Sequence, residues 1–316
     1  MTQDDETKLL EDLGAQVRNW GRWGADDERG TLNLITAEKR AAAASLVRRG
    51  AVFSLTIPLD ADGPQGSDPR NPRRNPLHVL TRTGTDPPQV NGTGGTSRYT
   101  DDMVVMHLQA ATQWDALAHV FYDDRLYNGF PAATATTRGA TRLGMEKYYD
   151  ELVSRGVLLD IARLHEVETL PAGHRVTAEE LDEACTTQRV TVEAGDIVLL
   201  RTGLMAVRDR TGGWAAFEGA APGVHYTTAT WFAEHGVAAL ACDNTAVESY
   251  GVLQHYAIPF HMLALRDMGM PLGEYWYLEE LAADCADDRV YEFLLVAPGL
   301  RVTGAVGSPV TPLAMK

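Results

Sequence analysis

Five polar side chains interrupt an otherwise apolar stretch about one third of the way along the 316-residue chain: Gln109, Thr112, Gln113, Asp115 and His119. Because alternate residues of an extended chain share one face, the four odd-numbered members of this set are expected on the same side. A carboxylate beside an imidazole can transfer protons or ligate a metal ion. The stretch is therefore our first candidate for an active site, although a polar edge facing solvent would show the same pattern.

The surrounding residues predict how the backbone delivers these side chains. Residues 103–108 form an apolar run that predicts a buried strand, and a turn-rich segment follows at 123–129. Apolar runs bounded by glycine at 156–160 and 195–203 predict buried core strands. A further strand is predicted within 235–248, with an acid at its polar end.

Helical patterns alternate with these strands. Thr177-Ala-Glu-Glu180 is a capping box that predicts a helix reaching Cys185, and Thr36 is a suitable N-cap for a helix that follows it. Further helices are predicted at 144–154 and 227–234. The alternation of helices and strands predicts an α/β fold.

Chain length and composition fit one large domain over residues 1–316. With 45% apolar residues, a chain of this length can bury a large core. We expect an extended N-terminal segment at 1–50 and a long loop region at 58–100, which is rich in Pro, Gly and Asn. The loop region carries a basic cluster that includes Arg73, which could grip a substrate carboxylate or simply be solvated.

The charge balance narrows the range of partners. The net charge is −15, from 28 Lys and Arg against 43 Asp and Glu, which argues against binding to nucleic acid or an anionic membrane. We see no apolar run long enough to span a membrane and no signal peptide. The three cysteines, Cys185, Cys242 and Cys285, are widely spaced, which excludes a zinc finger or a disulfide scaffold and favours free thiols. We expect a cytoplasmic protein that binds a small molecule.

The polar stretch resembles a known signature. Residues 109–119 are similar to the His-x-Gly-Thr-His-x-Asp-x-Pro-x-His motif of the cyclase family, which includes bacterial kynurenine formamidase and isatin hydrolase. Thr112, Asp115 and His119 match the motif, whereas Gln109 and Gln113 stand where the family has its first two histidines. The chain thus carries a Gln-x-x-Thr-Gln-Trp-Asp-x-x-x-His variant.

Segments outside the motif extend the resemblance. Residues 23–36 resemble the opening of a large branch of the family, and 258–274 resemble its C-terminal His…Gly…Glu segment. In the family the late His and Glu complete the active site, which implies His261 and Glu274 here. The resemblance also implies a swivelling β/β/α arrangement, with a central β-structure surrounded by helices, and a homodimer or larger homo-oligomer.

The family signature carries an expectation about metal ions. In members with the full motif, its histidines and aspartate are associated with manganese or zinc, which polarises a carbonyl and activates water. A glutamine offers only a neutral carbonyl oxygen, which is a much poorer ligand. Asp115 and His119 remain as the expected ligands if a metal is retained, with help from a Gln109 or Gln113 oxygen; otherwise no cofactor is expected.

Three functions remain open at this point. The first is hydrolysis of an amide, lactam or lactone bond in a small cyclic or aromatic substrate. The second is a metal-independent cyclase, dehydratase or isomerase of a natural-product pathway, with glutamine side chains as hydrogen-bond donors. The third is a non-catalytic family member. The expected catalytic residues are Asp115, His119, His261 and Glu274. The expected substrate-binding residues are Gln109, Thr112, Gln113, Trp114 and Arg73.

Overall fold

A mixed nine-stranded sheet forms the centre of the molecule, in the order β1-β15-β13-β7-β9-β11-β12-β4-β14. The computed structural model describes residues 2–66, 72–85, 98–217 and 219–316. The strands of the sheet are β1 (Val52–Ser54), β4 (Gln113–Asp115), β7 (Val153–Asp160), β9 (Ile197–Arg201), β11 (Ala239–Cys242), β12 (Leu272–Glu274), β13 (Glu292–Val296), β14 (Gly307–Pro309) and β15 (Leu313–Met315).

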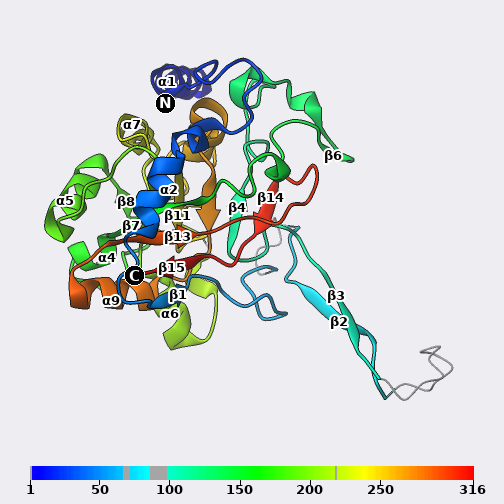
Figure 1. Cartoon of the computed structure of the whole chain (residues 1–316). Coiled ribbons are helices and arrows are strands. Elements are labelled where there is room, and N and C mark those ends of the chain that lie inside the picture. The colour runs from blue at the N-terminus through cyan, green and yellow to red at the C-terminus, as the bar shows by residue number, and fades with distance from the viewer. Residues whose placement is uncertain (1, 67–71, 86–97, 218) are drawn as a thin grey trace.

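Helices surround this sheet (Figure 1), as the α/β prediction requires. They are α1 (Gln3–Val17), α2 (Ala37–Ala44), α4 (Ile161–Leu164), α5 (Ala178–Gln188), α6 (Leu204–Thr211), α7 (Ala229–Glu234), α8 (Pro259–His261) and α9 (Glu279–Asp288), with a π-helix at Met262–Met268 directly after α8. The N-caps predicted at Thr36 and Thr177 are confirmed, because each hydroxyl accepts the backbone N–H three residues later. None of the helices in these described ranges has the length and apolar character needed to cross a membrane.

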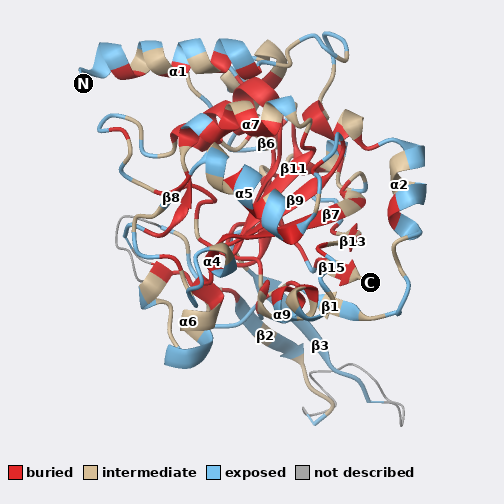
Figure 2. Cartoon of the chain, turned by 90° about the vertical axis from the view of Figure 1, so that its left-hand side faces the viewer, coloured by how far each residue is buried: buried red, intermediate tan, exposed pale blue. Residues whose placement is uncertain are grey.

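The middle of the sheet is parallel and almost entirely buried. Strands β7, β9, β11 and β12 run parallel to one another, and antiparallel strands flank them on both sides. The residues of β9 and β11 are buried without exception, which explains the apolar runs at 197–200 and 239–242. Figure 2 shows these strands as the buried centre of the molecule. The core strands predicted at 156–160, 195–203 and 235–248 are therefore confirmed.

A two-stranded hairpin projects from the body of the protein (Figure 1). It pairs β2 (Leu77–Arg82) antiparallel with β3 (Asp101–Val105). Every residue of β3 is exposed, so the buried strand predicted at 103–108 is wrong. The apolar run was misleading because it belongs to an arm outside the core. The expected long loop at 58–100 is likewise interrupted by β2. Residues 67–71, which include Arg70 of the basic cluster, and residues 86–97 lie outside the described residues.

Two further expectations fail for local reasons. The helix predicted at 144–154 is only a short 3-10 turn at Met145–Lys147, because β7 already begins at Val153. The extended alternation expected over 109–119 holds only in β4, since turns flank this strand on both sides. Two small two-stranded sheets complete the described strands. In one, β8 (Arg175–Val176) pairs parallel with β10 (Gly223–Val224). In the other, β5 (Ala135–Thr136) pairs antiparallel with β6 (Gly139–Ala140).

Candidate active site

Strand pairing brings the two halves of the candidate site together. In the antiparallel pair β4 and β12, Gln113 lies directly opposite Glu274, so their side chains meet on one face. The Gln113 Nε2 group donates to Glu274 Oε2 at 2.7 Å and lies 3.3 Å from Asp115 Oδ1. One carboxamide therefore links two buried carboxylates that are 159 residues apart in the chain, at Asp115 and Glu274.

His261 faces these carboxylates from another element. It ends α8, which begins with Pro259 and continues directly into the π-helix, a distortion found often at functional sites. Its Nε2 atom lies 3.4 Å from Glu274 Oε1 and 3.6 Å from Asp115 Oδ2. Its other ring nitrogen, Nδ1, is 2.7 Å from Glu248 Oε1. The ring is thus fixed on one side and directed at the two acids on the other.

Glu248 forms hydrogen bonds with the backbone at the start of α8 as well as with the ring of His261. Its two oxygens accept the backbone N–H groups of Phe260 and His261, each at 2.8 Å. The site residues expected from the sequence do not include Glu248. The acid at the polar end of the strand predicted within 235–248 was its only signal, because nothing local shows that this carboxylate reaches a histidine 13 residues later.

The electrostatics follow from three buried carboxylates around one buried imidazole. Burial works to lower the pKa of His261, but the carboxylates of Asp115, Glu248 and Glu274 raise it well above its ordinary value. Burial and the adjacent charge of Asp115 raise the pKa of Glu274 to about 7. Burial also opposes ionisation of Asp115, yet the neighbouring His119 and His261 hold the pKa of Asp115 below its usual range. The site therefore pairs a carboxylate that stays ionised with one that titrates near neutrality.

Tyr250 is a second residue that the sequence did not single out. Burial and the nearby Glu274 carboxylate raise the pKa of Tyr250 to about 12. The phenol therefore stays protonated at neutral pH. We find no sequence signal for its position, because it lies in an irregular segment after β11.

His119 and Arg73 form the more open side of the site. The His119 side chain is 21% exposed against 3% for His261, and its Nε2 atom lies 3.7 Å from Asp115 Oδ1. The Arg73 guanidinium lies 3.4 Å from the same Nε2 atom, and because a guanidinium can only donate, this contact requires Nε2 to be an acceptor. Burial, with the Arg73 charge, lowers the pKa of His119, so its imidazole is neutral near pH 7.

Several buried polar atoms in the site have no hydrogen-bond partner among the described residues. They are Gln109 Nε2, Gln113 Oε1 and Asp115 Oδ2. Buried polar groups are normally paired, so these atoms are suited to bind a water molecule, a ligand or an ion. Gly307, opposite Asp115 on β14, leaves the space for the Gln109 carboxamide: a Cβ atom at 307 would lie 2.4 Å from Gln109 Nε2.

Two of the expected substrate-binding residues lie in the scaffold. The Thr112 hydroxyl donates to the Tyr275 carbonyl at 2.6 Å and accepts the Ile57 N–H at 3.0 Å, which ties three segments together. The Trp114 ring is fully buried and donates through Nε1 to the Ala297 carbonyl. The structure therefore brings Gln109, Gln113 and Arg73 to the candidate catalytic residues, but not these two side chains.

The donor set for a metal ion differs from the one that the signature suggested. At the signature positions, two neutral carboxamides replace imidazoles, and the Gln113 carboxamide presents its N–H group to the acids. By contrast, ligand atoms of Asp115, His261 and Glu274 all lie within 4.8 Å of one another. Asp115 Oδ2 has no hydrogen-bond partner among the described residues, so this second set fits a divalent ion. His119 is not part of it.

The comparisons with known proteins identify the family of the chain. Residues 53–249, more than half of the chain, match the family described as putative cyclase. A solved structure described as a novel cyclase is 41% identical, with a TM-score of 0.84, over 95% of this chain and 99% of its own. No protein with a curated description matches the sequence.

More distant solved structures share the fold. Isatin hydrolase A from Ralstonia solanacearum is 20% identical over 89% of this chain and 96% of its own, with a TM-score of 0.63. Isatin hydrolase A from Labrenzia aggregata, bound to benzyl benzoate, is 17% identical over 86% of this chain and 94% of its own, with a TM-score of 0.62. The family match and the 41% identical structure together establish that this chain belongs to the cyclase family.

Proposed function

We propose that this protein is a hydrolase that opens an amide, lactam or lactone bond in a small cyclic or aromatic substrate. The observation that carries the proposal is the buried array of Glu248, His261, Asp115 and Glu274, in which one carboxyl group titrates near neutral pH. Membership of the cyclase family and the isatin hydrolases among the structural neighbours support hydrolysis as the reaction class.

Glu274 is the proposed general base. A base is most effective when its pKa lies near the working pH, and the pKa of Glu274 is raised to about 7. Its carboxylate takes a proton from the attacking water as the new C–O bond forms. The same proton then passes to the leaving nitrogen or oxygen as the scissile bond breaks. The net reaction adds one water across the bond.

The remaining side chains stabilise charge and orient the reacting groups. In the metal-free site, His261, fixed by Glu248, keeps a positive charge beside Asp115 and Glu274. The unpaired Gln109 Nε2 group is suited to donate to the oxygen of the substrate carbonyl, where negative charge develops. On the open side, Arg73 and neutral His119 are placed to contact the rest of the substrate.

A divalent ion is compatible with this arrangement. Asp115, His261 and Glu274 would hold it, and His261 would have to release its Nε2 proton. When bound there, manganese or zinc would polarise the carbonyl and activate water. The roles given above to Gln109, Arg73 and His119 are the same with or without the ion.

A metal-independent cyclase, dehydratase or isomerase is the second candidate. The specific observation in its favour is the Gln113 carboxamide, which stands at a signature histidine position and donates toward both Glu274 and Asp115. At a position where the family signature has a metal-associated histidine, this neutral N–H group instead donates hydrogen bonds to the carboxylates. Gln109 would then stabilise an enolate in place of a tetrahedral oxyanion.

A substrate panel in oxygen-labelled water distinguishes the two candidates. Isatin is the first probe, followed by aryl lactams, lactones and formamides, and then by their open-chain acids. Ring opening with one labelled oxygen in the product supports the hydrolase, whereas ring closure or loss of water from the open-chain compounds supports the second candidate. Wild-type turnover in Asp115→Asn or Glu274→Gln would contradict both.

A further inference from the structure

We propose that His165, His174 and Glu180 form a second divalent-metal site, separate from the candidate active site. The ligand atoms of these residues lie within 4.8 Å of one another. Glu180 Oε1 is 2.5 Å from His165 Nε2 and 2.8 Å from His174 Nε2. The two imidazoles thus converge on a single carboxylate oxygen, each through its own Nε2 atom.

The local sequence fixes the carboxylate in this position. Glu180 is the third residue of α5 and belongs to its capping box, in which Oε2 accepts the Thr177 N–H at 2.8 Å. That bond leaves Oε1 to face the two rings. His165 directly follows α4, and His174 directly precedes β8. The three ligands therefore come from the end of one helix, the start of another and the loop between them.

The donor chemistry fits zinc or a similar transition-metal ion. Two imidazoles and one carboxylate are a common zinc set, and water can fill the fourth position. Donors around a tetrahedral ion at ~2.0–2.1 Å lie about 3.3 Å apart. The present contacts of 2.5 and 2.8 Å would need to open by less than an ångström. The side chains are 40%, 21% and 15% exposed for His165, His174 and Glu180, so an ion and its water can reach them.

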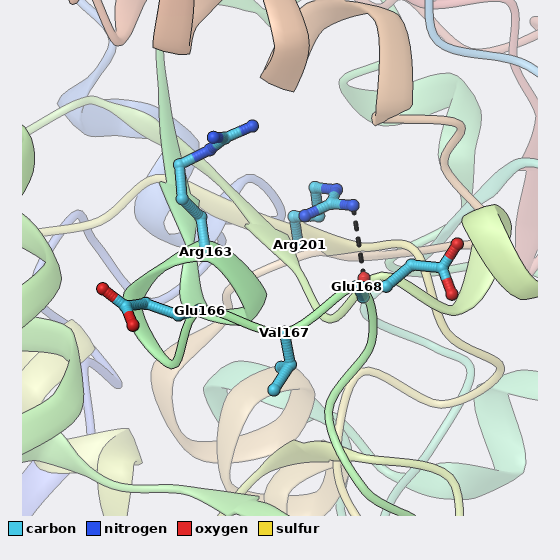
Figure 3. Close-up of a pocket in the computed structure, with 5 residues that line it drawn as sticks. All are labelled: Arg163, Glu166, Val167, Glu168 and Arg201. Atoms are coloured by element: carbon cyan, nitrogen blue, oxygen red, sulfur yellow. Dashed lines mark hydrogen bonds between the residues drawn. The ribbon is translucent and has the colours of Figure 1, made fainter.

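The ion would restrict the conformation of a loop that lines a cavity. Residues 166–168, which follow His165 immediately, line this cavity together with Arg163 and Arg201 (Figure 3). Glu166 adopts a left-handed conformation with φ of 56°, so the chain turns sharply beside the proposed ligand. Arg201 already pairs with Asp160 and Glu279, so we assign no ligand to the cavity itself. The proposed role of the ion is to order the loop between α4 and α5.

The chain offers a conservative variant and a matched control. In Glu180→Gln the capping box can persist, because glutamine serves at this position of the motif, but the anionic ligand is lost. His78→Ala is the control, since His78 is another exposed histidine that pairs with a carboxylate, Asp102, at 2.8 Å on the hairpin. All variants carry Asp115→Asn as well, so that an ion in the candidate active site does not dominate the measurement.

Zinc titration by calorimetry on the chelator-stripped, full-length protein tests the site, with cobalt absorption reporting the coordination. We expect one zinc ion per chain in the Asp115→Asn background and in His78→Ala. Binding should be lost in His165→Ala and in His174→Ala, and weakened roughly tenfold or more in Glu180→Gln with the apo melting temperature kept. Zinc should raise the melting temperature only where it binds. Unchanged binding in both histidine variants, or no zinc binding in the Asp115→Asn background, would overturn the proposal.

Discussion

Glu248 and His261 form a buried pair in which Glu248 Oε1 lies 2.7 Å from Nδ1 of the ring. The same carboxylate accepts the backbone N–H of His261, so it sets both the ring orientation and the start of the helix that carries it. The pairing leaves Nε2 directed at Asp115 and Glu274. Such an outer partner fixes which ring nitrogen carries the proton and how basic the ring is.

Replacing Glu248 by glutamine should impair catalysis more than folding. Without the Glu248 charge the pKa of His261 should fall, and kcat should drop by about 10–100-fold, as is typical for outer partners of a functional histidine. Steady-state kinetics across pH, with an NMR titration of the histidines, measure both effects. An unchanged kcat in Glu248→Gln would remove this residue from the site.

Glu6 provides the matched control for that experiment. Its oxygens accept the backbone N–H groups of Gln254 and His255, and Oε2 lies 3.1 Å from His255 Nδ1. This arrangement repeats the contacts of Glu248, but Glu6 lies on α1 and its partners are Gln254 and His255 rather than a catalytic residue. Glu6→Gln should therefore leave kcat and its pH profile unchanged. A matching loss of kcat in both variants would show that the effect is one of general stability.

The pH dependence of the rate should report Glu274. Since the pKa of Glu274 is raised to about 7, a reaction that needs its carboxylate as base should accelerate as the pH rises through about 7. Glu274→Gln should lose this rise of the rate with pH, together with most of the activity. A profile that is flat between pH 5 and 8 would contradict the assignment of the base.

The same group should make the fold less stable as pH rises. Below about pH 4.5 the carboxyl is protonated in both the folded and the unfolded chain; between 4.5 and 7 only the unfolded chain ionises, so stability falls until the folded group ionises near 7. The full penalty is roughly 3 kcal/mol. Urea unfolding of the wild type and of Glu274→Gln across this range isolates the contribution, and equal slopes in the two proteins would refute it.

Gly307→Ala should disturb the oxyanion donor. The added methyl group would lie 2.4 Å from Gln109 Nε2, so the carboxamide would have to move. We expect Gln109→Ala to lower kcat by about 100-fold, as for loss of one oxyanion donor, and Gly307→Ala to act through the same residue. The double variant should then be no worse than Gln109→Ala alone. Gly213→Ala, where a Cβ atom meets nothing within 4 Å, is the control.

Metal content should follow the donor set seen in the structure. In the His165→Ala background, we expect about one divalent ion per chain by mass spectrometry, lost in Asp115→Asn and in Glu274→Gln. His119→Ala should keep the ion, because His119 lies outside the group formed by Asp115, His261 and Glu274. Chelation should remove the ion and slow hydrolysis, because the ion would polarise the substrate carbonyl. The rate of the metal-free protein is the one whose pH dependence reports Glu274. Full turnover after complete chelation would favour the metal-independent candidate.

We propose that the projecting hairpin binds a second copy of this chain. The hairpin exposes five apolar residues, and about half or more of the surface of each one is accessible to solvent: Leu77, Leu80, Met103, Val104 and Val105. An isolated two-stranded hairpin is marginally stable in water, so a covering partner is expected. The described residues 72–85 and 98–107 contain four Arg and two Asp, a charge of +2, whereas the rest of the chain carries 24 Lys and Arg against 41 Asp and Glu, a charge of −17. An acidic second copy therefore complements the arm.

Light scattering on Leu80→Glu and on Val104→Glu tests this association. Both variants should shift a dimer or larger oligomer toward monomer, because a buried charge in the interface is costly. Val302→Glu, at another exposed apolar residue, should leave the mass unchanged. A monomeric wild type, or an unaltered oligomer in both hairpin variants, would refute the proposal.

Local sequence is enough to specify the elements that depend on neighbouring residues. The caps at Thr36 and Thr177 and the unbroken apolar runs of β9 and β11 predicted their helices and strands correctly. These signals succeed because a cap or a buried parallel strand is encoded within a few positions of the chain. The variant motif at 109–119 likewise indicated the family to which the chain belongs, because a signature of this kind lies within eleven consecutive residues.

Which groups meet in the site depends on the tertiary structure. Gln113 contacts Glu274 across 161 residues, and Glu248 reaches His261 because of how the chain turns after β11, and neither contact leaves a periodic trace in the sequence. The strand at 101–105 shows that a local pattern can also mislead about burial. Its apolar residues have the pattern of a core strand, but whether such a strand is covered depends on what packs against it, which local composition does not encode.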